Sequence, residues 1–157
     1  MRNVLITGMS GTGKSAALVE LEKRGFLVVD TDSPEWSEWV PGDDEWLWRE
    51  DRIAELLAED RDRTLFVSGC MSNQGRFYDR FDAVVLLSAP AQVIVERVDR
   101  RTTNDYGKAA RERDLILRHL EEVEPLLRAT STHELDASRR LTEVVDALEE
   151  IVSRRAP

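Results

Sequence analysis

Short apolar runs alternate with longer amphipathic runs along the chain. The apolar runs predict five strands, at residues 3–7, 26–30, 64–68, 83–88 and, more weakly, 133–136. The segments "VLI", "LFV" and "VVLL" are apolar at successive positions, which fits strands that are buried on both faces of a sheet. Strands that alternate with helices favour a parallel sheet covered by helices. The pattern therefore predicts an α/β fold with five parallel strands.

The amphipathic runs predict five helices, at residues 14–24, 44–60, 90–101, 111–128 and 141–153. Gly25 directly after the first helix is a plausible C′ glycine. Pro90 opens the third helix, where a proline is tolerated, and Pro125 is expected to kink the fourth helix near its end. We find no repeat or obvious linker, so residues 1–157 are expected to form a single domain.

A glycine-rich segment lies between the first strand and the first helix. The segment "GMSGTGKS" at residues 8–15 fits the pattern G-x-x-x-x-G-K-[ST]. Glycines let the backbone turn its N–H groups toward a phosphate, Lys14 can reach the β and γ phosphates, and Ser15 offers a hydroxyl to Mg²⁺. The alternative is a plain turn linking strand to helix. We expect a nucleoside triphosphate here, held by Gly8, Gly11, Thr12, Gly13, Lys14, Ser15 and Ala16.

Two aspartates end the second strand, in "VVDTDSP". In a parallel α/β sheet ligands bind beyond the carboxyl ends of the strands, so Asp30 and Asp32 should lie at the same edge as the phosphate loop. Alternate residues of an extended segment point the same way. We expect Asp30 to join Ser15 at a hydrated Mg²⁺, and Asp32 to act on an acceptor hydroxyl as base or orienter. The alternative is an aspartate-rich turn that caps backbone amides.

Composition narrows the class of partner. The net charge of −9 argues against a general nucleic-acid surface or an anionic membrane surface. No apolar run is long enough to span a bilayer, and the amino terminus "MRNVLITGMS" is not typical of a secretory signal. Cys70 is the single cysteine, which excludes an internal disulfide and fits a reducing compartment. A cytoplasmic location is expected, without nucleic acid or membrane partners.

The chain resembles the small-molecule P-loop kinases, most closely shikimate kinase with its gluconate-kinase and nucleoside-monophosphate-kinase-like relatives. The resemblance is carried by "GMSGTGKS", by "DTD", by the "SG" of "LFVSGC" and by "RRTTNDYGK", and it extends to "ELDASRRLTEVVDALEEI". It implies a P-loop NTPase three-layer α/β/α sandwich with strand order 2-3-1-4-5. It also implies an acceptor-binding region at about 33–62, a lid at about 101–112, and transfer of the γ-phosphoryl group of ATP, with Mg²⁺, to a small acceptor.

Basic residues crowd one segment of this acidic chain, at Arg97, Arg100, Arg101, Lys108, Arg111 and Arg113. Phosphoryl transfer depends on cations around the migrating group, and we expect Arg101 to serve as one of them. The resemblance implies that Arg100 or Arg101 stacks on the adenine and that Lys108 is the lid cation. The alternative is an ordinary solvated helix face.

The acceptor side is indicated by aromatic and basic residues. All four tryptophans lie between residues 36 and 48, and Trp48–Arg49 stands where the family has a phenylalanine–arginine pair. Arg49 is a candidate clamp for an anionic acceptor, with Arg76 and Gly69 after the third strand as further contacts. The alternative for each tryptophan is packing, and Cys70 is interpreted as a small filler. The family's glycine triplet is here Gly69 followed by a cysteine and a methionine, so shikimate itself is not the predicted acceptor.

These features predict an ATP-dependent kinase that phosphorylates a hydroxyl of a small molecule, as a monomer or weak homodimer. One alternative is a nucleoside monophosphate kinase, with Arg49 and Arg76 on the acceptor phosphate. Another is a nucleotide-binding regulatory protein, or slow ATPase, without a small acceptor. The sequence lacks an N-K-x-D motif typical of GTPases, and no strand ends in adjacent acids as in motor ATPases.

Overall fold

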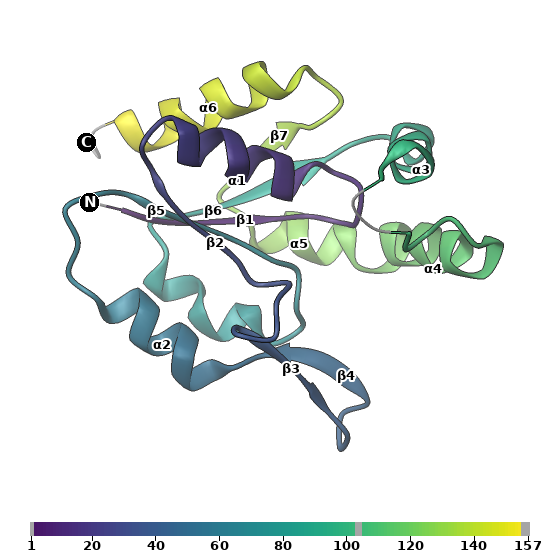
Figure 1. Ribbon diagram of the computed structural model, residues 1–157, viewed down its shortest axis with the longest axis horizontal. Coiled ribbons are helices and arrows are strands. Elements are labelled where there is room, and N and C mark those ends of the chain that lie inside the picture. Colours follow the sequence, from purple (N-terminus) through teal and green to yellow (C-terminus); the bar gives the residue numbers. More distant parts are fainter. Residues whose placement is uncertain (1, 103–104, 155–157) are drawn as a thin grey trace.

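The centre of the molecule is a parallel sheet of five strands (Figure 1). The computed structural model describes residues 2–102 and 105–154. Its sheet strands are β1 (Asn3–Thr7), β2 (Leu27–Asp30), β5 (Leu65–Ser68), β6 (Ala83–Ser88) and β7 (His133–Asp136). They lie in the order β2-β5-β1-β6-β7, which is 2-3-1-4-5 when these strands alone are numbered along the chain. The predicted fold class is confirmed, and each strand bound agrees within one residue.

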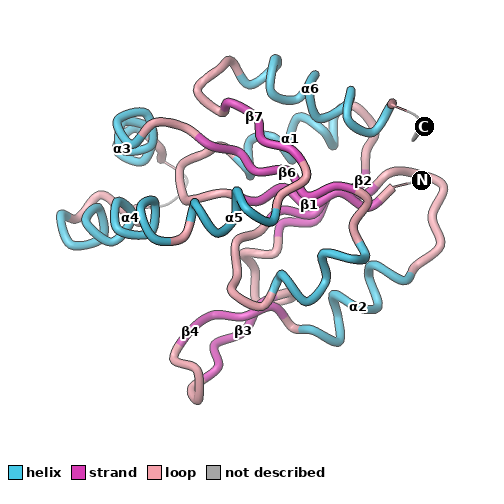
Figure 2. Tube along the Cα trace, turned by 180° about the vertical axis from the view of Figure 1, so that it is seen from behind, coloured by secondary structure: helices cyan, strands magenta, loops and turns pink. Residues whose placement is uncertain are grey.

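Helices cover both faces of the sheet (Figures 1 and 2). On one face lie α1 (Lys14–Lys23) and α6 (Leu141–Ser153). On the other lie α2 (Glu50–Ala58), the 3₁₀ helix η1 (Gln74–Arg80) and α5 (Glu124–Thr130). Two more helices, α3 (Ala91–Arg100) and α4 (Ala110–Glu122), extend past the carboxyl ends of the strands. No helix in the described part of the chain combines the length and apolarity that crossing a bilayer requires.

Successive side chains of the central strand β1 point to opposite faces of the sheet and so contribute to two separate hydrophobic cores. Val4 and Ile6 of β1 pack on the α1/α6 side, whereas Leu5 packs on the α2 side with Ile53. All four side chains are fully buried. A strand covered on both faces must be apolar at every position, which explains the continuous apolar runs in the sequence.

The predicted C′ glycine is confirmed at the end of α1. Gly25 has φ +92°, and its N–H donates to the Glu22 carbonyl at 3.0 Å. The Phe26 N–H reaches back to the Leu21 carbonyl at 3.2 Å. This pair of bonds is the Schellman arrangement, which satisfies carbonyls at the helix end and turns the chain into β2.

The helix predicted at 44–60 is wrong in its first part. Glu45–Trp48 forms β4, which pairs antiparallel with β3 (Ser37–Val40), and α2 begins only at Glu50. Trp39 pairs with Trp46 across this hairpin. The turn between the strands is "PGDD", in which Asp44 takes φ +53°. Two short alternating runs around a turn are a hairpin signal that outweighs the apolar helix face further on.

The predicted helix at 111–128 is two helices. It breaks at Val123, because Pro125 has no N–H to continue the hydrogen-bond ladder of α4. The N–H groups of Leu126 and Leu127 donate instead to the Val123 carbonyl, at 3.0 and 3.1 Å, and so begin α5. In place of the kink expected at Pro125, one helix ends and a second begins, with the proline in the first turn of the second helix.

Candidate functional site

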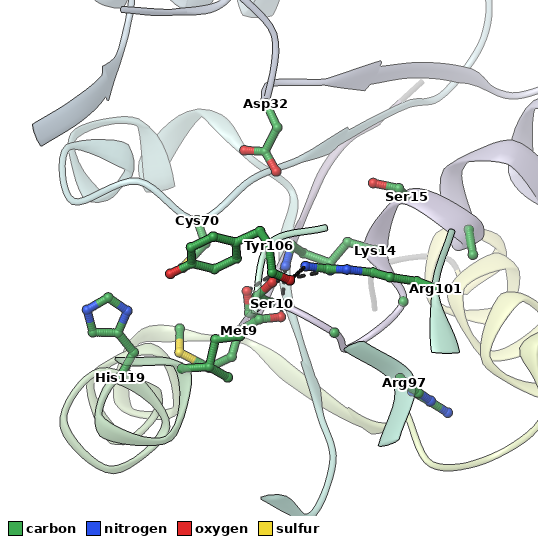
Figure 3. A pocket seen from close by; sticks show the side chains of 15 residues that line it. Met9, Ser10, Lys14, Ser15, Asp32, Cys70, Arg97, Arg101, Tyr106 and His119 are labelled. Atoms are coloured by element: carbon green, nitrogen blue, oxygen red, sulfur yellow. Dashed lines mark hydrogen bonds between the residues drawn. The ribbon is translucent and has the colours of Figure 1, made fainter. Parts of the chain in front are cut away.

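A cavity of about 440 Å³ opens beyond the carboxyl ends of the strands. It lies between the phosphate loop, the end of β2 and the segment that joins α3 to α4 (Figure 3). Its lining residues are Gly8, Met9, Ser10, Gly11, Gly13, Lys14, Ser15, Ala16, Asp32, Cys70, Arg97, Arg101, Tyr106, Ile116 and His119. The phosphate loop and the second aspartate of "DTD" therefore meet at one place, as the sequence predicts.

The phosphate loop packs closely on the end of the neighbouring strand β6. A Cβ on Gly8 would lie 2.4 Å from the Leu87 carbonyl oxygen, so only glycine fits there. Thr12 is buried, and its hydroxyl donates to the Met9 carbonyl at 2.9 Å, so it closes the loop from inside instead of lining the cavity. No side chain caps the start of α1, and its first turn carries no acid. Free N–H groups at this helix end suit an anion.

Lys14 is folded back over this loop. Its Nζ donates to the carbonyls of Gly8 at 2.7 Å and Met9 at 3.0 Å. Burial lowers the pKa of Lys14, and the nearby Cys70 and Asp32 act in the opposite direction. A cation held among carbonyl oxygens at the mouth of a glycine loop is placed to meet phosphate oxygens.

The first aspartate of "DTD" contacts the residue after Lys14. Ser15 Oγ donates to Asp30 Oδ2 at 2.9 Å, and the Asp32 N–H donates to Asp30 Oδ1 at 3.0 Å. The Asp32 side chain instead opens onto the cavity (Figure 3). Partial burial raises the pKa of Asp32, the charge of Lys14 lowers it, and that of Asp30 raises it further.

These oxygen atoms fit a magnesium ion that also binds phosphate. Within residues 2–102 and 105–154, no group of three or more His, Cys, Asp or Glu side chains is arranged to hold a metal by itself. Mg²⁺ usually takes only one or two protein carboxylates and completes its shell with water and substrate phosphates. The Ser15–Asp30 pair beside Lys14 has that limited donor set.

Two arginines of the basic segment reach the cavity, Arg97 and Arg101. Arg101 Nη1 lies 3.5 Å from Ser10 Oγ, and its Nη2 donates to the Tyr106 carbonyl. Its buried Nε has no hydrogen-bond partner within the part of the chain that the structure describes. An unsatisfied guanidinium N–H at this position fits an anionic ligand.

Arg100 and Lys108 do not line this cavity, contrary to the prediction that they contact the nucleotide. Arg100 is exposed on α3, and Lys108 Nζ pairs with Asp105 at 3.5 Å. The predicted lid spans 101–112, of which 103 and 104 lie outside the described residues. Arg100 is the last residue of α3, whereas Arg101 leaves the helix in an extended conformation and contacts Ser10 of the phosphate loop.

The prediction that Trp48 and Gly69 bind the acceptor is corrected by their burial. Trp48 is only 2% exposed, and its indole Nε1 donates to Thr31 Oγ1 at 2.8 Å. A Cβ on Gly69 would lie 2.2 Å from the same Thr31 oxygen. The β3–β4 hairpin folds Trp48 inward, so these residues support the sheet edge below the cavity.

The predicted anion clamps do not line the cavity either. Arg49 Nη1 pairs with Glu38 at 2.7 Å, and its Nε donates to the Pro34 carbonyl at 3.0 Å. Arg76 pairs with Glu50 at 3.0 Å on the surface. Each guanidinium charge is thus matched by a carboxylate outside the cavity.

Sequence reasoning missed the residues that α4 and the preceding segment contribute. Tyr106, Ile116 and His119 all line the cavity, and so does Cys70, which was interpreted as a filler. Ile116 and His119 are three apart on α4, so they share a helix face. That spacing is visible in "ILRH", but the direction in which this face points depends on how α4 packs against the loop.

Comparison with known proteins places the chain in a family. Residues 4–118 match the family described as an AAA domain. This protein belongs to the AAA domain family. A curated relative named a nucleotide-binding protein, from Burkholderia cenocepacia strain HI2424, is 30% identical over 162 residues, covering 88% of this chain and 48% of the relative. Another nucleotide-binding protein, from Albidiferax ferrireducens, is 66% identical over 32 residues, 20% of this chain and 11% of the relative. The aligned region is about half the length of the Burkholderia relative.

Several solved structures similar to this AAA-domain protein are named as small-molecule kinases. A shikimate kinase from Acinetobacter baumannii matches with a TM-score of 0.68 at 16% identity, over 97% of this chain and 93% of that one. A gluconokinase from Sinorhizobium meliloti 1021 matches at 0.64 and 21%, over 97% and 95%. A deoxyadenosine kinase from M. mycoides matches at 0.65 and 12%, over 98% and 100%. The resemblance to the small-molecule P-loop kinases is confirmed at the level of the fold.

Proposed function

We propose that this protein is an ATP-dependent kinase that transfers the γ-phosphoryl group to a hydroxyl of a small molecule. One observation carries the proposal: the Asp32 side chain opens onto the same cavity as Lys14, beside the Ser15–Asp30 pair. This is the minimum set for the reaction, namely a base candidate, a phosphate cation and a magnesium ligand pair. The fold shared with solved kinases supports it, and the names of the curated relatives support its nucleotide-binding part.

The triphosphate would lie along residues 8–15, and the nucleobase of ATP would lie in an adjoining cavity. That second cavity has a volume of about 240 Å³ and is lined by Thr12, Gly13, Ala16, Arg97, Ala137, Arg139, Leu141 and Val144. It shares Gly13, Ala16 and Arg97 with the first cavity. A largely apolar recess that shares lining residues with the phosphate-loop cavity suits the base of a purine nucleotide. On this proposal Arg97, in place of Arg100, is the arginine nearest the adenine of ATP.

In the proposed reaction the acceptor oxygen attacks the γ-phosphorus and forms a new O–P bond. The bond from the γ-phosphorus to the β,γ-bridging oxygen breaks, ADP leaves, and the hydroxyl proton passes to the Asp32 carboxylate. Lys14 and Arg101 stabilise the charge on the migrating group. A bound Mg²⁺ would neutralise charge on the β and γ phosphate oxygens. The raised pKa of Asp32 makes it a stronger base than an ordinary aspartate once it is ionised.

Calorimetry with ATP and ADP tests the nucleotide part of the proposal. We expect Mg²⁺-dependent binding to the wild-type protein and loss of most of that affinity in Lys14→Ala. The transfer part is tested by ADP release in the presence of hydroxylated acceptors, with Asp32→Asn as the second variant. Equal nucleotide affinity in the wild type and Lys14→Ala would refute the placement of the triphosphate.

A second candidate is a nucleotide-binding regulatory protein without a small acceptor. The curated relatives are named only as nucleotide-binding proteins, and this favours it. Under this alternative, ATP binds and is hydrolysed slowly at a rate that no acceptor increases. No acceptor hydroxyl is then deprotonated, so Asp32→Asn has no acceptor-dependent turnover to abolish. The same ADP-release assay therefore separates the two candidates.

A further inference from the structure

The main cavity has two chemically different sides. Figure 3 shows Cys70, Tyr106 and His119 on one side of Lys14, with Ser15 and Arg97 on the other. We term Asp32, Cys70, Tyr106, Ile116 and His119 the acceptor wall; all five line the cavity. They come from four places in the chain: the end of β2, the end of β5, the segment before α4, and α4 itself.

The lysine and arginines of the cavity all serve the phosphate side. Lys14 is bound to carbonyls of the loop, Arg101 contacts Ser10 of the loop, and Arg97 also borders the second cavity. The acceptor wall includes no lysine or arginine, and its one carboxylate is Asp32. Lys14 lies near Asp32 and Cys70, but on the proposed function its charge is taken up by the triphosphate. An acceptor anion placed on the wall would therefore face the like charge of Asp32 without a cation of its own, which is unfavourable.

Nearby arginines outside the cavity do not change this balance. Arg49 is paired with Glu38, and Arg76 Nη1 donates to both carboxylate oxygens of Glu50 at 3.0 Å. Capturing an acceptor carboxylate or phosphate with either arginine would require breaking an existing ion pair. The freed glutamate would then repel the incoming anion.

The acceptor wall does offer contacts for an uncharged ring or apolar face. Ile116 is 3% exposed and presents aliphatic carbon, and the Tyr106 ring lies between Asp32 and His119 in Figure 3. An aromatic face packs well on flat rings and sugars. A neutral imidazole has one donor and one acceptor nitrogen, which suits a hydroxyl or an amide.

Building on the proposed function, we infer that the phosphoryl acceptor lies against the acceptor wall and is a neutral hydroxyl compound with a ring or other apolar face, without carboxylate or phosphate. The acceptor hydroxyl meets the γ-phosphoryl group next to Asp32, and the ring packs on Tyr106 and His119. This excludes acids such as shikimate or gluconate and also nucleoside monophosphates.

Matched pairs of acceptors that differ only in an anionic group test the charge of the substrate. We would measure acceptor-stimulated ADP release with methyl shikimate against shikimate and with gluconamide against gluconate. Wherever a pair stimulates turnover, we expect kcat/KM for the neutral member to be at least about tenfold higher, which corresponds to about 1.4 kcal/mol. A preference for the anionic member in any pair overturns the inference.

Cys70 provides a second readout that does not need turnover. Because it is the chain's single cysteine, the rate of its alkylation by iodoacetamide reports on this wall alone. With ADP saturating, neutral members of the panel should slow the labelling and their anionic counterparts should not. If no compound either stimulates ADP release or protects Cys70, the assignment of the wall to the acceptor is wrong.

Two neighbouring residues of α4 give a matched pair of variants. His119→Ala should raise KM for the best neutral acceptor by about tenfold, because a neutral hydrogen bond and a packing face are lost. The Kd for ATP, measured separately by calorimetry, should change less than this KM. Arg118→Ala is the control, because Arg118 is exposed and lies outside the cavity. An equal effect of both variants, or a larger effect from Arg49→Ala, contradicts the inference.

These outcomes separate the inference from the function on which it rests. Absence of ATP binding, or binding that Lys14→Ala does not weaken, refutes the proposed kinase as well. ATP binding and transfer to an anionic acceptor leave the kinase in place and refute only the neutral acceptor.

Discussion

Asp32 opens onto the cavity, with Asp30 two residues before it and Lys14 among the cavity's other lining residues. Its raised pKa means that the fold favours the neutral acid, whereas the proposed reaction needs the carboxylate. The proposed chemistry and the stability of the fold therefore place opposite demands on this residue, as is common at active sites.

Asp32→Asn should stabilise the protein while it abolishes most acceptor-dependent turnover. The stability contributed by the neutral Asp32 is present below the ordinary aspartate pKa of about 3.9 and is lost as pH rises through the raised pKa of the folded state. The variant should thus match the wild type in acid and exceed it near pH 7. The gain should be below about 1 kcal/mol, because the side chain is partly exposed to solvent. Urea unfolding at several pH values measures it, and a gain that grows toward acid would contradict this account.

Gly69→Ala should destabilise the protein by about 1–3 kcal/mol, the usual cost of a disrupted buried hydrogen bond. The added Cβ would meet Thr31 Oγ1 at 2.2 Å and Trp48 Nε1 at 3.1 Å. These two atoms form a hydrogen bond with each other, which the Cβ would disrupt. Gly75→Ala is the control, since nothing lies within 4 Å of its Cβ position. Urea unfolding followed by tryptophan fluorescence compares the two, and equal stability of both variants would show that Gly69 does not need its missing side chain.

At the scale of elements, the sequence was most informative where pattern and context agree. The buried strands, α6 and the Gly25 cap were predictable, because continuous apolar runs, helical spacing and a C′ glycine each have one dominant structural meaning. The hairpin was missed because "EWLW" continues into a genuine helix face, so a local pairing signal was read as part of it.

For the candidate site, the motif residues of the loop and Asp32 were predictable from chain order, since strand ends meet at one edge. Trp48 and Arg49 were placed wrongly, because whether a side chain faces core or cavity depends on the hairpin register. The contribution of His119 depends on the packing of α4, which no local pattern encodes.

The hairpin carries an exposed aromatic pair whose energetic coupling can be measured. Trp39 and Trp46 are 46% and 52% exposed, with ring centroids 6.1 Å apart in an edge-to-face arrangement. A double-mutant cycle with alanine at both positions should give a coupling of about 0.5–1.5 kcal/mol in global unfolding. Strictly additive effects would mean that the pair contributes nothing beyond its separate burial. Turnover should be retained, because neither ring lines the cavity.

At the scale of the whole molecule, side-chain contacts tie the helices beyond the sheet to the loop. Arg101 donates hydrogen bonds to the Ser10 hydroxyl and the Tyr106 carbonyl. Arg113 of α4 forms a salt bridge with Asp99 of α3 at 2.5 Å. The phosphate loop, the predicted lid and both helices are therefore linked. A ligand bound in the cavity should stabilise this assembly as one unit.

Mg²⁺·ATP at about 100 times its Kd should raise the free energy of unfolding by about 2.7 kcal/mol. For a chain of this size that corresponds to a rise in Tm of roughly 5–11 °C. Chelation of Mg²⁺ should remove a large part of the shift, and Asp30→Asn should behave like the chelated wild type, since Asp30 pairs with Ser15. Differential scanning calorimetry measures both, and a shift that chelation leaves intact would argue against the metal pair.

The ion pairs of Arg49 with Glu38 and of Arg76 with Glu50 have a consequence for how substrate range could evolve. The positive charge of each guanidinium is already present and is neutralised by the carboxylate with which it pairs. Losing a single acid would leave one of these guanidinium groups without its carboxylate, so a positive charge would become available without any new basic residue. Drift toward anionic acceptors in descendants of this chain should therefore begin with substitutions at the two glutamates.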